Sequence, residues 1–349
     1  MPLPQSIRAF HPQSPAIEEM ATVCANESEY EVSRRADANE TLIVSQALQT
    51  VTLDALRAVY PGILFRQLAS QQGGLTPGTA SFTWDEYDVA GMAKLIANYG
   101  DDLPDVTAFI TQNVGIVRSL GNAFKYSKQD VRAVLEARRL GRQGIVLDVD
   151  RVALAREIME RKKDEIAAIG SPLGKLPGIL KNPNVTVLSA AAPATGTSKK
   201  WTGVDKTGQE IVTDLRNLTS QVRIQSKGIH SPTTVVMPIE EYEAASRKSL
   251  TINNMETTAL AHFLNTETQS GRAIQVMQWN RAAKADAAGT GPRVMAYEAS
   301  AEAVRVVEPL DFEADPPQRV GLEFRVPCES RFGGIYIRRP LAFAYLDFV

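Results

Sequence analysis

The printed sequence ends in VPCESRFGGIYIRRPLAFAYLDFV, residues 326–349. β-Branched and aromatic residues recur through this stretch, and glycine and proline divide it into short runs, which is typical of strands joined by turns. The same pattern extends back to Glu302, and no apolar residues recur at helical spacing in this block. We therefore expect an all-β block. The predicted strands are Val304–Val307, Val320–Val326, Gly334–Ile337 and Leu341–Leu346.

A mixed pattern precedes this block, from Pro172 to about Ser300. A loop ending in a short strand, SPLGKLPGILKNPNVTVLSAA (171–191), comes first. Helical spacing and turn-bounded apolar runs then alternate, which predicts a mixed α/β region. The predicted helices are Gly208–Gln221, IEEYEAASRK after Pro238, and Glu256–Leu264; the predicted strands are Thr233–Met237, Ala273–Trp279 and Arg293–Tyr297.

The clearest helical pattern lies between Ser127 and Ile169. Ser127 with Asp130 three residues later is close to a capping box, and Gly170 ends the pattern together with the serine and proline that follow it. A helix of about 40 residues would be about 60 Å long. We therefore expect either a break at the weak point Gly141–Gly144 or a strut along an extended molecule.

An aromatic-rich stretch precedes the helix. Glycine and proline turn signals are followed by strand-like runs over Ala80–Val89 and Val106–Ser119, which predict a long β-hairpin with its tip near Ala97–Asp105. A two-stranded ribbon is marginal alone in water, so it needs a partner surface, such as another subunit. The candidates for contact between subunits are Trp84, Tyr87, Asp88, Lys94, Asp101 and Asp102.

The first 58 residues form a poorly patterned leader. They are rich in polar residues, and four prolines fall within the first fifteen positions. Such a segment cannot bury much of its own surface. We expect an extended arm that is ordered only where a partner holds it.

The charge balance limits the classes of partner. The chain has 38 Lys and Arg against 40 Asp and Glu, a formal net charge of -2. Within the long helical pattern, ten basic residues face eight acidic ones between positions 128 and 165. This near balance favours a solvated helix face with mixed ion pairs over a surface that faces a polyanion. A dedicated nucleic-acid binder shows a basic excess, so we expect any contact with nucleic acid to be local and weak.

Histidines, cysteines and apolar runs give no sign of a metal centre or a membrane segment. His11, His230 and His262 do not have metal-ligand spacing. Cys24 and Cys328 are too few for a disulfide framework or a zinc site, so we expect free thiols. No signal-type run and no stretch of roughly 20 apolar residues occurs. We expect folding in a cytoplasm and no contact with a membrane.

Two short motifs resemble catalytic ones without matching them. Gly170–Lys175 is one residue short of a phosphate-binding loop and lacks the following Ser or Thr. Asp205–Gly208 reads DKTG, like the start of the motif phosphorylated in transport ATPases, but Gln209 follows instead of Thr. No serine-hydrolase elbow occurs. We therefore expect no catalytic residues, no cofactor and no metal, and a protein that is not an enzyme.

Taken together, these segments resemble a known family. Three stretches carry the likeness: TWDEYDVAGMAKLIANYGDDLPDV (83–106), the loop at 170–185 that contains LPGILKNPNV, and residues 326–349. They resemble the major capsid proteins of tailed bacteriophages with the Hong Kong 97-type fold. The family-like C-terminal motif consists of Cys328, Arg331, Gly333, Gly334 and Pro340.

The resemblance implies an α+β Hong Kong 97-like phage capsid fold with an N-terminal arm, an extended β-hairpin loop, a long spine helix, an axial domain and a peripheral domain. The implied boundaries are 1–58 for the arm, 59–126 for the extended loop and its flanking strands, 127–170 for the spine helix of the peripheral domain, 171–300 for the axial domain, and 301–349 for the C-terminal strands of the peripheral domain.

The resemblance also implies a structural role. Copies of the chain would assemble as hexamers and pentamers into an icosahedral head around double-stranded DNA, in the host bacterial cytoplasm, with portal, scaffold and decoration proteins as partners. Contact with the packaged DNA would be weak and non-specific. A covalent Lys–Asn link between subunits, known in one variation of the fold, is not expected. The alternatives are an encapsulin-like bacterial nanocompartment shell and a soluble α/β enzyme with an unrecognised site.

Overall fold

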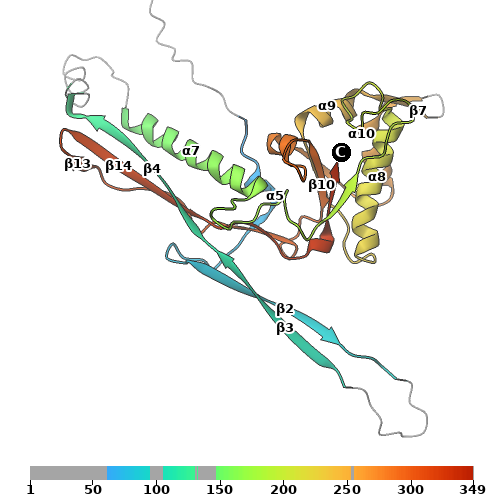
Figure 1. The fold of residues 1–349 in the computed structure, drawn as a ribbon, viewed down its shortest axis with the longest axis horizontal. Helices are drawn as coiled ribbons and strands as arrows, with labels where there is room; N and C mark the ends of the chain where they lie inside the picture. Colours follow the sequence, from blue (N-terminus) through green and yellow to red (C-terminus); the bar gives the residue numbers. More distant parts are fainter. Residues whose placement is uncertain (1–60, 95–104, 130–131, 133–146, 253–254, 349) are drawn as a thin grey trace, which may run out of the picture. The chain divides into compact units, whose positions relative to one another are not determined.

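The computed structural model describes residues 61–94, 105–129, 132, 147–252 and 255–348 (Figure 1). Three predicted features lie outside the described residues: the leader at 1–58, the tip of the hairpin before Asp105, and the weak point at Gly141–Gly144.

The predicted hairpin is confirmed as the antiparallel strands β2 (Ser81–Ala90) and β3 (Thr107–Ile116). They pair without a break from Ser81↔Ile116 to Ala90↔Thr107. The second strand ends earlier than predicted, because the buried Val117 separates it from a further strand, β4 (Arg118–Ser127). The two residues after Ser127 are helical, as the capping pattern predicts.

Strand β4 belongs to a second, four-stranded sheet. Its partner is β14 (Glu323–Phe332), with ten consecutive antiparallel pairs from Ser127↔Glu323 to Arg118↔Phe332. The other edge of β14 pairs with two shorter strands, β12 (Leu310–Ala314) and β13 (Gln318–Val320). The chain therefore joins segments about 200 residues apart in sequence along one long strand pair.

Helix α7 (Leu147–Ile169) packs on this sheet. Ala155 and Met159 of the helix form a small apolar cluster with Tyr126 of β4 and with Val326 and Cys328 of β14. The side-chain amide of Asn122 in β4 donates to the Ala155 carbonyl (2.9 Å). The helix ends where the sequence predicts, since Gly170 adopts φ +86°, a conformation that side chains disfavour.

A five-stranded mixed sheet forms the centre of the other region. Its order is β5 (Thr186–Ser189), β16 (Phe343–Asp347), β10 (Arg293–Tyr297), β6 (Thr234–Met237) and β9 (Gln275–Gln278). All residues of β6, β10 and β16 are buried, which explains their largely apolar sequences; the buried Arg293 of β10 pairs with the buried Asp347 of β16 (2.6 Å). Strand β16 pairs with β5 and β10, whereas the other strands of residues 301–349 belong to two further sheets, so the pairing divides this block among three sheets.

Helices cover one face of the five-stranded sheet. Their apolar residues share a core with side chains of β6, β10 and β16, while the opposite face packs on a second core that includes Phe65, Trp279 and Phe332. The helices are α8 (Gly208–Gln225), α9 (Ile239–Arg247) and α10 (Ala259–Gln269).

The remaining elements are short. They are helix α5 (Phe65–Leu68), the three-stranded sheet β1 (Ser70–Gln71), β11 (Val304–Val307) and β15 (Gly334–Ile337), the hairpin β7 (Ser249–Ile252) and β8 (Met255–Thr258), and the 3-10 helices η1 (Asn280–Lys284) and η2 (Pro340–Ala342).

Several predicted elements have the wrong bounds; for example, the predicted strand Leu341–Leu346 begins only at Phe343, because η2 precedes it. The predicted helix at Glu256–Leu264 begins only at Ala259, because residues up to Thr258 pair with β7, and Thr258 then caps the helix by accepting from the Ala261 amide (3.3 Å). The predicted strand Val320–Val326 contains a turn at Gly321, so β14 starts at Glu323. Strands β10, β11 and β15 have the predicted bounds.

Candidate functional site and assembly surfaces

The ribbon formed by β2 and β3 has two chemically different faces. Directly opposed residues of an antiparallel pair lie on the same face, and successive residues alternate between faces. One face therefore carries Tyr87 opposite Ile110, and these side chains are 71% and 62% exposed. We call this the apolar face. Its members are Tyr87, Val89, Ala108, Ile110, Val114 and Ile116, interrupted by the hydrogen-bonded pair of Asp85 and Gln112 (3.3 Å).

The opposite face fixes the base of the ribbon to the rest of the chain. Phe82 and Trp84 pack edge-to-face on Tyr336 of β15, with ring centroids 5.0 and 5.5 Å away. The guanidinium of Arg338 lies over the Trp84 ring (5.7 Å). The Ile116 amide donates to the Tyr336 hydroxyl (2.9 Å). We call this group the ribbon anchor.

The contact candidates predicted from the sequence fall into three groups. Tyr87, Asp88 and Lys94 are exposed, on the outer part of the ribbon and just beyond it. Trp84 is half-buried in the ribbon anchor of its own chain. Asp101 and Asp102 lie outside the described residues.

The residues of the family-like C-terminal motif lie in different structural environments. Gly334 adopts φ +90°, and a Cβ there would lie 2.6 Å from the Pro177 carbonyl oxygen, so any side chain would push away the 170–185 loop. Arg331 donates a hydrogen bond to the carbonyl of Pro77, which precedes β2 in the sequence. Cys328 is buried between β14 and α7 as a free thiol, and burial raises its pKa. Gly333 follows β14, and Pro340 begins η2.

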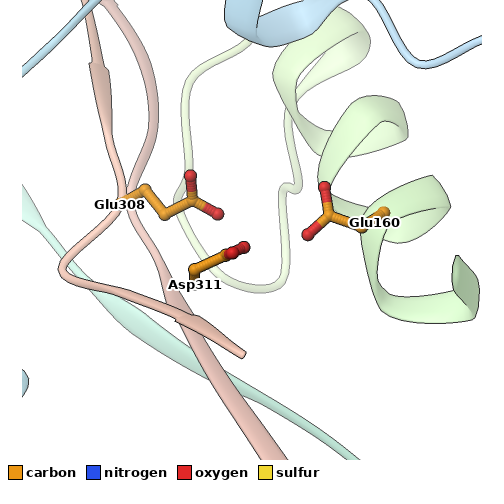
Figure 2. A group of neighbouring side chains, drawn as sticks. All are labelled: Glu160, Glu308 and Asp311. Atoms are coloured by element: carbon orange, nitrogen blue, oxygen red, sulfur yellow. The ribbon is translucent and has the colours of Figure 1, made fainter. Parts of the chain in front are cut away.

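Three carboxylates converge beside helix α7. Figure 2 shows Glu160 of α7 pointing toward Glu308 and Asp311 of the C-terminal strand region, and their oxygens lie within 4.8 Å of one another. Oxygen clusters of this kind can hold a hard cation. Here the Lys163 ammonium lies among them, 2.8 Å from Glu160, 2.7 Å from Glu308 and 3.1 Å from Asp311. The cluster therefore carries its own cation.

Two further cations complete this acidic cluster. Arg66 of α5 bonds to Glu308 (2.9 Å) and Glu160 (2.9 Å), and Arg156 of α7 reaches Asp311 (2.6 Å). Burial opposes the charge on Lys163, but the hydrogen bonds that its ammonium donates to Glu160 and Glu308 outweigh burial and raise its pKa. Burial likewise opposes the charge on Asp311, yet Lys163 and Arg66 lower its pKa to about 2. The cluster is a structural ion network that ties α5, α7 and the β11–β12 connection together.

The two motifs that resemble catalytic ones, Asp205–Gly208 and Gly170–Lys175, have structural roles. Thr207 of the DKTG motif caps α8 in a full capping box with Glu210, whose carboxylate accepts from the Thr207 amide (2.7 Å). The buried Lys206 pairs with the buried Asp214 (2.9 Å). Gly170–Lys175 forms the turn after α7, closed by hydrogen bonds between Ser171 and Leu176.

One carboxyl in the described residues has a pKa near neutrality. Burial raises the pKa of Glu241 to about 7, although the Trp201 amide donates to it (2.9 Å) and opposes that shift. Glu241 is buried beneath the 190–206 loop, so a substrate cannot reach it. Among the helices within the described ranges, none combines the length and the apolar character that a bilayer crossing requires.

The architecture defines the class of protein. An exposed ribbon, a long helix on a four-stranded sheet and a separate helix-covered sheet form the fold of tailed-phage capsid subunits. The capsid chain of Myoviridae phage XM1 matches with a TM-score of 0.71 at 17% identity, covering 87% of this chain and 98% of that one. A chain of Mycobacterium phage Bobi matches with a TM-score of 0.59 at 12% identity, covering 89% of this chain and 99% of that one. The capsid chain of the native GTA particle matches with a TM-score of 0.55 at 13% identity, covering 87% of this chain and 96% of that one.

The sequence agrees with the fold. The profile of the major capsid protein family matches residues 91–349, so this chain belongs to the major capsid protein family. No curated protein sequence matches it significantly. Its role is structural, as the shell subunit of a tailed phage or a phage-like particle.

Proposed function

We propose that copies of this chain assemble through hexamers and pentamers into an icosahedral head that encloses the double-stranded DNA of a tailed phage. The exposed apolar face of the ribbon carries this proposal. A two-stranded ribbon with one apolar side is marginal in water unless a partner covers it. Many identical contacts of this kind give a shell its stability without one strong pair.

The segments have distinct tasks in this proposal. Residues 1–58 are the arm, 59–126 the extended loop and its flanking strands, 127–170 the spine helix, 171–300 the axial domain and 301–349 the strands that complete the peripheral domain. The ribbon lies on a neighbouring subunit. Tyr87, Asp88, Lys94, Asp101 and Asp102 contribute to that contact from the outer part of the ribbon, and Trp84 from its base.

Assembly takes place in the host bacterial cytoplasm, with a portal, a scaffold and decoration proteins as further partners. The packaged DNA meets a chain with a net charge of -2, so its contacts are weak and non-specific.

The test is to purify the protein made alone and to measure its sedimentation velocity, with negative-stain electron microscopy of the fastest fraction. We expect shells, tubes, or discrete pentamers and hexamers. If the protein made alone is a monomer, the experiment is repeated with a scaffold protein co-expressed. A stable dimer or tetramer that forms no shell even then would contradict the proposal and favour a soluble enzyme.

A further inference from the structure

Three arginines lie along the seam between helices α8 and α10, which run side by side on the five-stranded sheet (Figure 1). Arg223 of α8 and Arg272, three residues after the end of α10, pair with the same buried carboxylate, Glu267, at 3.3 Å each. Arg216 lies two turns earlier on α8, about 10 Å from Arg223 along the helix axis. Three guanidinium groups therefore face one carboxylate. We call Arg216, Arg223 and Arg272 the arginine seam.

Arg216 has only neutral partners within the part of the chain that the structure describes. Its guanidinium donates to the Thr266 hydroxyl (3.2 Å) and lies 3.5 Å from Nε2 of His262. Burial lowers the pKa of His262, and the positive charge of Arg216 lowers it further, so the imidazole is neutral at pH 7. Neither partner compensates the charge of Arg216, which leaves that charge for an anion from outside the chain.

The acidic residues of the two helices, both fully described, are already engaged. Asp214 is buried and pairs with Lys206, Glu267 holds Arg223 and Arg272, and Glu210 caps the start of α8. The accessible residues around the arginines are therefore neutral and able to form hydrogen bonds. They are Gln209, Thr213, Asn217, Ser220, Asn265 and Gln269.

This surface chemistry fits the phosphate backbone of DNA better than another protein. Arginine, serine, threonine, asparagine and glutamine side chains commonly contact DNA phosphates, and a guanidinium can bind two phosphate oxygens at once. The distance of about 10 Å between Arg216 and Arg223 corresponds to about three nucleotides of one strand, at about 3.4 Å each. A protein partner would need apolar anchors. On these two helices, both within the described ranges, the exposed large apolar side chains are limited to Ile224.

We propose that the arginine seam binds the phosphate backbone of the packaged double-stranded DNA without reading its sequence. This inference rests on the proposed shell function, and it assigns the weak DNA contact of that proposal to a particular surface. Binding of phosphates by cationic side chains releases counterions from the DNA, so the affinity falls as the salt concentration rises. The number of phosphates contacted determines how steeply it falls.

The test measures how a short double-stranded DNA binds the unassembled protein, by fluorescence anisotropy at a series of salt concentrations. We expect Arg216→Gln with Arg272→Gln to weaken binding at least about tenfold at low salt. The slope of log affinity against log salt should fall by about 2, since two phosphate contacts are lost. Arg216→Lys with Arg272→Lys keeps both charges and should keep the slope. Glu267 retains Arg223 in the glutamine variant, and thermal melting shows whether each variant is folded.

The matched control removes the same charge from another surface. Arg319→Gln with Arg325→Gln changes two exposed arginines of β13 and β14 and should leave the slope unchanged. An equal fall in the control and in the seam variant would mean that only the net charge matters, and it would overturn the proposal. Poly-glutamate is the competing probe. If the seam substitutions weaken the binding of poly-glutamate but not of the duplex, the seam belongs to an acidic protein partner and the proposal is wrong.

The outcomes separate this site from the shell function. The seam variants should form shells in the absence of DNA as well as the wild-type protein does. If the wild-type protein forms shells and the seam substitutions do not change duplex binding, the DNA site is wrong and the shell function stands. If the wild-type protein forms no shells even with a scaffold, the shell function itself fails.

Discussion

Individual buried charges determine how this subunit holds its shape. Lys163 is completely buried, and it is the cation at the centre of the Glu160, Glu308 and Asp311 cluster. In the sequence, Lys163 is one of several charged residues in a helix that carries both signs, and nothing distinguishes it from its neighbours. Its role depends on two carboxylates more than 140 residues away, which only the folded chain brings to it.

Replacing Lys163 should destabilise the protein strongly. We expect Lys163→Met to lower the free energy of unfolding by about 3–5 kcal/mol, because three carboxylates then face only two cations, Arg66 and Arg156, and one buried negative charge is left without compensation. The control is Lys162→Met, which removes an exposed pair with Glu165 on the same helix and should cost at most about 1 kcal/mol. Urea unfolding measures both. Equal losses would mean that the buried cluster contributes no more than a surface pair.

Glu241 gives stability a defined pH dependence. Its folded pKa of about 7 lies above the ordinary value of 4.5, so the folded state holds the proton more tightly than the unfolded chain. The stability from this group is complete below about pH 4.5 and is lost as the pH rises through 7. Glu241→Gln, which can still accept from the Trp201 amide, should weaken the fall in urea midpoint between pH 5 and pH 8. Glu243→Gln, an exposed substitution on the same helix, should leave that fall unchanged.

At the scale of elements, the ribbon depends on an anchor at its base. Phe82 and Trp84 alternate on one face of β2, and both rings meet Tyr336 of β15. The alternation predicts that the two rings share a face. It does not identify Tyr336, since a strand pattern specifies which face is apolar and not what covers it.

The hydroxyl of Tyr336 should stabilise the ribbon locally. Tyr336→Phe removes the acceptor of the Ile116 amide at a cost of about 1 kcal/mol, so the amides of β2 and β3 near the anchor should exchange hydrogen faster while those of β10 do not change. Tyr87→Phe removes a hydroxyl from the exposed part of the same ribbon and is the control. Uniformly faster exchange throughout the chain would indicate a global effect instead.

At the scale of the whole molecule, the exposed apolar face points to other copies of the chain. Tyr87→Ser with Ile110→Ser should leave the melting temperature of the unassembled protein unchanged, because both side chains are already solvated. The yield of shells should fall at least about tenfold, since each of many contacts loses buried apolar area. Sedimentation velocity measures the yield. Thr111→Ser, on the other face, is the control, and normal assembly of the double variant would exclude this face as a contact.

Much of the secondary structure could be predicted from the sequence. The buried strands β10, β11 and β15 are short apolar runs between turn residues, and Gly170 ends α7 because its backbone conformation favours glycine. Start points were less predictable where a strand and a helix adjoin. Residues before Ala259 pair with β7 although their spacing suits a helix, because tertiary pairing overrides a weak local preference.

By itself, the sequence determined the local features: the ribbon, the end of the long helix, the near-neutral charge and the likeness to phage capsid proteins. The tertiary structure alone decided that β4 pairs with β14, that Lys163 neutralises the acidic cluster, and that Trp84 packs on Tyr336. The physical reason is the separation along the chain between the residues that interact. Local patterns follow from the geometry of neighbouring residues, whereas strand pairing and ion networks join residues far apart in the chain. A hydrophobic pattern shows which face is buried, but it does not identify the residues that cover that face.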